Sequence, residues 1–350
     1  MRNPELCPAR NVGLDQLAAA VSQSAFSAPP DGGAASYGVR VATPEVTAAT
    51  AAGGDMPTDP AELAARLDAA GYLADEGLAT AAFLALRMGR PLFLEGEAGV
   101  GKTFLGTSLA EALGAPLVRL QCYEGLDAAQ ALYDWDFPRQ LLHLRAAEAV
   151  GVRDAERLEH ELYDRRFLLA RPLLQALEAS TAARPVVLLV DEVDRADDEF
   201  EAFLLEVLGD ASITIPELGT VRAERPPLVV LTSNRTREVH DALKRRCLYH
   251  WLELPGFDRE VQVIRRRLPG VDERLAGDVA RAAQTLRGLD LLKPPGLAES
   301  VDWAAALDTL GARGLDADVA ARTLGAVLKH REDQERAAAY GLAALAGGGP

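Results

Sequence analysis

One glycine-rich segment of the sequence has the residue types and spacing that bind nucleotide phosphates. Residues 96–103 read Gly-Glu-Ala-Gly-Val-Gly-Lys-Thr and match the pattern GxxxxGK followed by Ser or Thr. Glycines let backbone N–H groups come close to phosphates, and the start of a following helix adds partial positive charge. We expect Lys102 to reach the β- and γ-phosphates of ATP, and the hydroxyl of Thr103 to bind Mg²⁺. The predicted nucleotide-binding residues are Gly96, Glu97, Ala98, Gly99, Val100, Gly101, Lys102, Thr103, Phe104 and, from a later segment, Asp191.

Two carboxylates follow the apolar run at residues 186–190. A buried strand that runs into Asp191 and Glu192 is expected when its tip faces a metal–phosphate centre. We predict that Asp191 holds Mg²⁺ through water, with Thr103 as the other protein ligand. Glu192 would polarise the attacking water. The alternative is a strand that ends in a solvated acidic loop, because further acidic residues follow at positions 194 and 197–199.

A second apolar run, at residues 228–231, also ends in polar side chains and leads to Asn234. In a doubly wound sheet the tip of this strand should lie beside the phosphate-loop strand. Asn234 is then expected to orient the water or to sense the γ-phosphate. The simpler alternative is an Asx turn at the end of a strand.

Three cations, Lys244, Arg245 and Arg246, precede the last apolar run. We predict that one arginine acts as a finger on the nucleotide of a neighbouring subunit, and we favour Arg246 over Arg245. This role requires an oligomer. The alternative is a cationic helix end that complements the helix dipole.

These residues need elements that bring them together, and the pattern of the chain supplies such elements. Short apolar runs at residues 91–94, 117–120, 186–190, 228–232 and 248–254 alternate with helical stretches at 104–113, 157–167 and 199–208. The alternation predicts an α/β fold in which helices cover both faces of a parallel sheet. Beyond residue 256 the pattern is helical, at 259–267, 273–286, 298–310 and 318–329.

The chain has 350 residues, a length typical of about two domains. Residues 1–57 are rich in Ala, Gly, Ser, Thr and Pro, and we predict a mostly disordered tail there. We expect an α/β nucleotide-binding domain with helical and hairpin inserts over residues 58–257, and an all-helical lid over residues 258–345. The lid has 13 basic and 14 acidic residues, so most of the net charge of −15 lies upstream.

Composition excludes several other classes of protein. The net charge of −15 argues against nucleic-acid or anionic-membrane binding, which usually requires a basic surface. The three cysteines lie far apart and do not form the spacing pattern of a disulfide framework. This suggests a reducing compartment. The five histidines have no metal-ligand spacing. The apolar runs are too short to span a membrane. We therefore expect a cytoplasmic protein.

A phosphate loop, an Asp-Glu pair, an Asn and an Arg, in that order and before a helical lid, resemble the AAA+ ATPases, and more narrowly the MoxR group. The segments at residues 120–135 and 242–251 are similar to those of CoxD-type ATPases, which are associated with maturation of a molybdenum- and copper-containing carbon monoxide dehydrogenase. The resemblance implies hydrolysis of ATP to ADP and phosphate. It also implies an assembly of identical subunits in a ring, usually a hexamer, a von Willebrand factor A-domain partner and a metalloenzyme client.

The resemblance assigns roles to individual residues. Lys102 and Thr103 match the Walker A motif, Asp191 and Glu192 match Walker B, and Asn234 matches sensor 1. Arg246 matches the finger, with Arg245 next to it. Gln121 matches a polar position that restrains the catalytic Glu. The catalytic set implied in this way is Gln121, Glu192, Asn234, Arg245 and Arg246.

The sequence departs from the MoxR pattern at residues 294–300, where relatives carry an arginine (sensor 2) and this chain has none. A charged helical insert at residues 138–174 replaces the hairpin of many relatives; it is either a solvated helix face or an insert that engages a partner. Residues 212–225 predict a β-hairpin facing the ring pore or a partner.

Three alternative functions are compatible with this nucleotide site. The protein could be a DNA-acting motor of the clamp-loader or branch-migration type, a MoxR ATPase with an unrelated client, or a switch that binds ATP without turnover.

Overall fold

A computed structural model describes residues 56–151 and 154–347 of the chain. The tail predicted for residues 1–57 therefore lies outside the described residues, apart from its last two. All described residues belong to the second of two units into which the chain divides, Pro44–Pro350.

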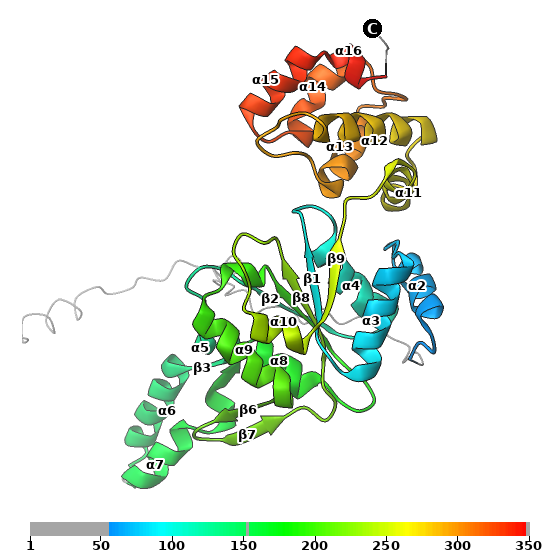
Figure 1. The fold of residues 1–350 in the computed structure, drawn as a ribbon. Helices are drawn as coiled ribbons and strands as arrows, with labels where there is room; N and C mark the ends of the chain where they lie inside the picture. Colours follow the sequence, from blue (N-terminus) through cyan, green and yellow to red (C-terminus); the bar gives the residue numbers. More distant parts are fainter. Residues whose placement is uncertain (1–55, 152–153, 348–350) are drawn as a thin grey trace, which may run out of the picture. The chain divides into compact units, whose positions relative to one another are not determined.

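The central element is a five-stranded sheet in the order β2-β5-β8-β1-β9, and each pair of neighbouring strands is parallel (Figure 1). The predicted parallel sheet is confirmed. Each strand lies on one of the apolar runs. The strands are β1 (Leu92–Gly96), β2 (Leu117–Gln121), β5 (Val187–Asp191), β8 (Leu228–Ser233) and β9 (Leu248–Leu252).

The burial of each strand explains its pattern of apolar residues. The three inner strands β1, β5 and β8 are buried at every position, because helices cover both of their faces. The edge strand β2 alternates between buried and more exposed residues, whereas β9 alternates between half-buried and exposed residues before the buried Leu252. The register pairs Gln121 with Asp191 and Glu95 with Ser233, so the polar ends of neighbouring strands meet at one edge of the sheet.

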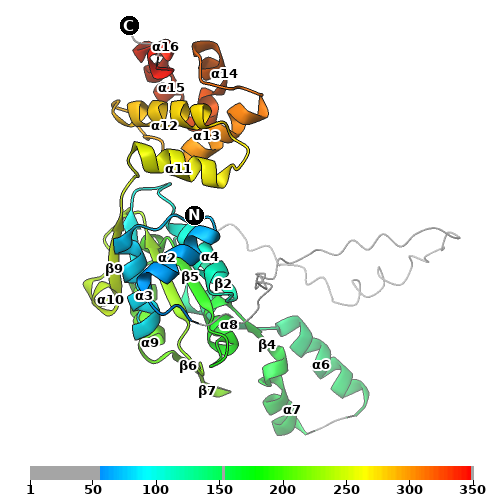
Figure 2. The ribbon, with the colours of Figure 1, turned by 90° about the vertical axis from the view of Figure 1, so that its right-hand side faces the viewer.

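Two separate apolar cores lie on the two faces of the sheet. Phe93, Leu188 and Leu231 point into one core, whereas their chain neighbours Leu92 and Leu189 point into the other. Figures 1 and 2 show the covering helices. One face is covered by α2 (Pro60–Ala69), α3 (Glu76–Met88) and α4 (Lys102–Ala112), the other by α5 (Ala128–Leu132), α8 (Pro172–Ala179), α9 (Asp198–Asp210) and α10 (Asp241–Arg246).

Two inserts depart from the sheet. The first contains α6 (Phe137–Ala149) and α7 (Ala155–Leu162) between the short antiparallel strands β3 (Tyr133–Trp135) and β4 (Leu168–Ala170). A single helix was predicted over residues 157–167, but α7 ends at Leu162. The chain then forms the 3-10 turn η1 (Arg165–Phe167), because the Asp164 carboxylate accepts from Arg166 N at 3.2 Å. The second insert is the hairpin of β6 (Ser212–Ile215) and β7 (Gly219–Arg222), in the region where a hairpin was predicted.

The C-terminal helical region has a core of its own. Trp303 is fully buried at its centre and donates from Nε1 to Thr323 Oγ1 at 2.8 Å. None of the described helices is long and apolar enough to cross a membrane. The helices of this region are α11 (Phe257–Arg267), α12 (Glu273–Arg287), α13 (Leu297–Thr309), α14 (Ala317–Val327), α15 (Arg331–Tyr340) and α16 (Leu342–Leu345).

Candidate nucleotide site

The glycine-rich segment forms the loop between β1 and α4. Gly99 and Gly101 adopt left-handed conformations, with φ of 79° and 100°, which residues with a side chain rarely adopt. α4 begins at Lys102, and no side chain caps its first turn. The N–H groups of that turn therefore remain available to an anion, and the helix dipole favours negative charge there.

Lys102 is buried beneath this loop. Its ammonium donates to the carbonyl oxygens of Gly96 at 2.7 Å and Glu97 at 2.6 Å. Burial lowers the pKa of Lys102 to about 8, although the carboxylates of Asp194 and Asp191 partly oppose this shift. The cation is thus held by weak carbonyl acceptors, which a phosphate oxygen would replace with a charged one.

Asp191 receives hydrogen bonds from three elements. Its carboxylate accepts from Thr103 Oγ1 at 2.8 and 3.0 Å and from Thr232 Oγ1 at 2.6 Å. It also forms an ion pair with Arg119, whose Nη2 lies 2.5 Å from Oδ2. The side chain of Asp191 is only 3% exposed, so these contacts fix its orientation.

Glu192 stands next to Asp191 in a left-handed conformation, with φ of 56°. Such a conformation costs free energy for a residue other than glycine and is frequent at functional sites. The side-chain amide of Gln121 donates to Glu192 Oε2, and that of Asn234 donates to Oε1, both at 3.3 Å. The structure therefore brings together three of the five predicted catalytic residues.

Asp194 was assigned to a solvated acidic loop under the simpler interpretation, and that interpretation is wrong for this residue. Asp194 is only 2% exposed. It accepts from the backbone N–H groups of Asn234 at 3.2 Å and Thr236 at 2.8 Å, and from Thr236 Oγ1 at 2.7 Å. This carboxylate holds the loop that carries Asn234. No sequence signal distinguishes it from the exposed acidic residues that follow.

The donors at this edge of the sheet fit Mg²⁺. Thr103 and Asp191 present a hydroxyl and a carboxylate, the oxygen ligands that Mg²⁺ prefers, and their side chains touch each other. Within the described residues no group of three or more His, Cys, Asp or Glu side chains could hold a metal ion on its own. Few protein ligands are expected where substrate phosphates and water complete the coordination.

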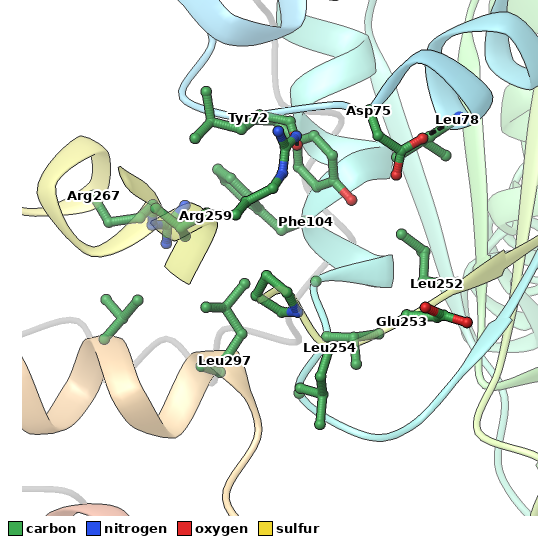
Figure 3. Close-up of a pocket in the computed structure, with 18 of the residues that line it drawn as sticks. Tyr72, Asp75, Leu78, Phe104, Leu252, Glu253, Leu254, Arg259, Arg267 and Leu297 are labelled. Atoms are coloured by element: carbon green, nitrogen blue, oxygen red, sulfur yellow. Dashed lines mark hydrogen bonds between the residues drawn. The ribbon is translucent and has the colours of Figure 1, made fainter. Parts of the chain in front are cut away.

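A pocket of about 440 Å³ adjoins the phosphate loop (Figure 3). Tyr72 and Phe104 line it with their rings 5.8 Å apart. The guanidinium of Arg267 lies 3.9 Å from the centre of the Phe104 ring, and Arg259 enters from the same helix, α11. Aromatic and aliphatic walls beside a phosphate loop suit a nucleobase. Apart from Gly99, Val100, Gly101 and Phe104, these residues were not predicted, because they come from distant segments without a local motif.

The stretch at residues 294–300, where the resemblance led us to expect an arginine, contacts the phosphate loop directly. Ala298 N donates to Gly99 O at 3.1 Å. A side chain on Gly296 would lie 2.8 Å from Ala98 O and 2.9 Å from Gly99 Cα. The C-terminal region therefore contacts the phosphate loop through its backbone. Its cations Arg259 and Arg267, on α11, line the neighbouring pocket instead.

Arg245 and Arg246 lie at the other edge of the sheet. They precede β9, whose first residue Leu248 donates from N to Pro91 O at the start of β1. A strand of five residues separates this edge from the phosphate loop by roughly 16 Å. Both arginines are exposed, and Arg246 donates to Leu205 O. Neither residue joins the site of its own chain.

The sheet, its phosphate loop and the C-terminal helical region together define the AAA+ P-loop NTPase fold. Residues 91–247 match the family described as AAA domain (dynein-related subfamily). These residues, somewhat less than half of the chain, are thus similar to AAA domains, a class that generally binds and hydrolyses nucleotide.

Among the solved structures that are similar to this chain are two of RuvB. One is described as the Thermotoga maritima RuvB Holliday junction branch migration motor, with 16% identity, a TM-score of 0.40, and coverage of 75% of this chain and 68% of that one. A RuvB mutant from the same organism gives 16% identity, a TM-score of 0.41, and coverage of 75% and 67%. These scores are too low to inform function. No curated protein gives a significant match.

Proposed function

We propose that this protein is an ATPase that converts ATP and water to ADP and phosphate. The observation that carries the proposal is the arrangement around β5, where Asp191 touches Thr103 and the two oxygens of Glu192 meet Gln121 and Asn234. A switch that binds ATP without hydrolysing it would need only the phosphate loop. A carboxylate that is held beside that loop by two amides and the guanidinium of Arg195 suits hydrolysis, because it can orient a water molecule.

Each residue has a separate part in this proposal. The loop amides and Lys102 bind the phosphates, and the pocket of Tyr72 and Phe104 holds the base. Mg²⁺, when held by Thr103 and Asp191, would neutralise charge on the phosphates. Glu192 accepts a hydrogen bond from the attacking water, and Asn234 fixes the other carboxylate oxygen.

Hydrolysis in this proposal takes place between subunits. Arg245 and Arg246 are exposed and lie at the edge of the sheet opposite the phosphate loop. A neighbouring copy in a ring, hexameric by resemblance, would bring one of them to the γ-phosphate, where a guanidinium stabilises negative charge in the transition state.

We further propose that ATP turnover drives remodelling of a client protein during metallocofactor maturation. The support is the resemblance of residues 120–135 and 242–251 to CoxD-type ATPases. In the structure, the first segment runs from the end of β2 to β3, beside the α6–α7 insert. The exposed side chains of Phe137, Leu141 and Leu142 on α6 give that insert an apolar surface. By the same resemblance, a von Willebrand factor A-domain protein is the expected partner.

The ATPase proposal is tested with the purified full chain and two variants. Lys102→Ala should abolish binding of a fluorescent ATP analogue, because the phosphates lose their buried cation. Glu192→Gln should keep that binding but lower phosphate release by about 100-fold or more. The matched control is Glu199→Gln, an exposed carboxylate at the start of α9. Unchanged hydrolysis in Glu192→Gln would refute the assignment of the base.

The client proposal needs a different experiment. The cofactor-free form of a molybdenum- and copper-containing carbon monoxide dehydrogenase, together with its A-domain partner, should raise ATP turnover severalfold. Double-stranded DNA should not, at low or at high salt. Stimulation by DNA that disappears at high salt would instead favour the DNA-motor alternative.

A further inference from the structure

The guanidinium of Arg119 contacts the carboxylate of Asp191, which we propose as a ligand of Mg²⁺. It lies on the edge strand β2, two residues before Gln121, so both side chains project from the same face of that strand. The register pairs Arg119 with Leu189 and Gln121 with Asp191. The long side chain of Arg119 therefore reaches along the strand to Asp191, where Nη2 lies 2.5 Å from Oδ2.

The surroundings of Asp191 give this contact its importance. The carboxylate is 3% exposed, and its other hydrogen-bond donors, Thr103 and Thr232, are neutral hydroxyls. A buried carboxylate without a cation is costly because it has lost its hydration. The Lys102 ammonium interacts with this carboxylate through space, but Arg119 is the cation that contacts it directly, and the Arg119 side chain remains 51% exposed and free to leave.

A magnesium ion at Thr103 and Asp191 would supply the same charge to the same group. Two cations at one carboxylate repel each other, so magnesium binding must weaken or displace the contact with Arg119. An ordinary surface ion pair would not have this consequence, because its carboxylate would not also be the metal ligand.

The same nitrogen of Arg119 has a second partner. Nη2 also lies 2.9 Å from Gln121 Oε1, and the amide of Gln121 donates to Glu192 Oε2 at 3.3 Å. Arg119 thus joins the predicted metal ligand to the residue that restrains the predicted base. A change in the contact between Arg119 and Asp191 therefore also affects the contact with Gln121, because one guanidinium makes both.

We propose that Arg119 is a positioning residue that holds Asp191 while no metal is bound and competes with Mg²⁺ for it. When magnesium is bound, Gln121 remains the partner of Arg119, which couples the metal to the restraint on Glu192. This inference rests on the proposed ATPase function.

The test measures binding of a fluorescent ADP analogue to the full chain as Mg²⁺ is increased, so no turnover is involved. In Arg119→Gln the half-saturating Mg²⁺ concentration should fall about threefold or more, because the competing charge is gone. Arg119→Lys keeps the charge and should stay within about twofold of the wild type. The matched control is Arg222→Gln, an exposed strand arginine on the separate β6–β7 hairpin.

A second readout is thermal stability with ADP present. The rise in Tm between excess chelator and saturating Mg²⁺ should be larger in Arg119→Gln than in the wild type, since the variant lacks the cation that contacts Asp191 when chelator has removed the metal. This comparison also covers a variant that folds poorly without metal.

Three results would overturn the proposal. They are an unchanged or higher Mg²⁺ requirement in Arg119→Gln, an equal fall in the Arg222→Gln control, and an equal fall in Arg119→Lys. If the wild type binds nucleotide with Mg²⁺ and hydrolyses ATP, each of these results leaves the ATPase function standing. A wild-type protein without Mg²⁺-dependent nucleotide binding would overturn both.

Discussion

At the scale of single residues, the candidate site is a chain of hydrogen bonds with one buried carboxylate at its centre. Thr232 is the least conspicuous member, since it is 1% exposed and lies within an apolar strand. Its hydroxyl donates to Asp191 at 2.6 Å and accepts from the backbone N–H of Glu192 at 2.9 Å. One hydroxyl therefore orients both the predicted metal ligand and the predicted base.

Thr232→Val keeps the shape of this side chain and removes the hydroxyl. We expect a loss of about 1–3 kcal/mol in the free energy of unfolding, because two buried polar groups lose their partner. ATP hydrolysis should fall with it. Chemical denaturation measures the first effect and phosphate release the second. Thr220→Val, on the exposed face of the hairpin, should change stability by no more than about 0.5 kcal/mol. Equal stability of the two variants would contradict the role of Thr232.

The two buried cysteines give a prediction about reactivity. Burial raises the pKa of Cys122 and of Cys247 to about 12. At pH 8 the reactive thiolate is then roughly 1,000-fold rarer than for a free thiol. In a Cys7→Ser variant, iodoacetamide should alkylate the native protein far more slowly than the protein in denaturant, as measured by mass spectrometry. Similar rates in the two conditions would show that these thiols are not buried.

At the scale of elements, the contact between α13 and the phosphate loop depends on a glycine. A side chain at Gly296 would lie 2.8 Å from the backbone oxygen of Ala98, a separation that real side chains essentially never show. The backbone of the loop or of α13 would have to move. The C-terminal helical region offers a natural comparison, because Gly277 in the middle of α12 faces open space.

We predict opposite effects of alanine at these two glycines. Gly277→Ala should stabilise the protein by about 0.5–1 kcal/mol, since alanine is the better helix former and nothing obstructs its side chain. Gly296→Ala should destabilise it by about 1–3 kcal/mol, in the range of other overpacked sites. Thermal unfolding of both variants measures the difference. A stabilising Gly296→Ala would show that α13 does not rest on the loop.

At the scale of the whole molecule, the two halves of the proposed active site lie at opposite edges of one sheet. Lys102 and Glu192 are at the carboxyl edge, while Arg245 and Arg246 are at the amino edge. Roughly 16 Å of strand lies between them. No side chain bridges that length, so a finger in this protein has to act on a neighbouring copy.

Mixing variants tests this arrangement. Lys102→Ala and Arg246→Ala should each be inactive alone. An equal mixture, exchanged before assay, should regain about a quarter of wild-type hydrolysis, because one variant supplies the nucleotide site and the other the finger. A mixture of Lys102→Ala with Glu192→Gln should stay inactive, since both changes damage the same half. If Arg245→Ala rather than Arg246→Ala is inactive alone and recovers in the mixture with Lys102→Ala, Arg245 is the finger.

The sequence by itself determined the elements and the local motif. Each strand of the sheet coincides with an apolar run. The phosphate loop is contiguous, so its residues can be named without tertiary information. Glu192 and Asn234 could also be named, because a polar residue after a buried strand is a local signal. The match of residues 91–247 to the AAA domain agrees with this part of the prediction.

Only the tertiary structure decided which distant residues share the site. Arg119 reaches Asp191 because β2 pairs with β5, and Asp194 is buried because the loop after β8 folds over it. The pocket of Tyr72 and Arg267 likewise joins the start of the described chain to α11. These contacts span 40 to almost 200 residues. Strand order and helix packing set them through the burial of two apolar cores, and no short pattern of residues records which strands become neighbours.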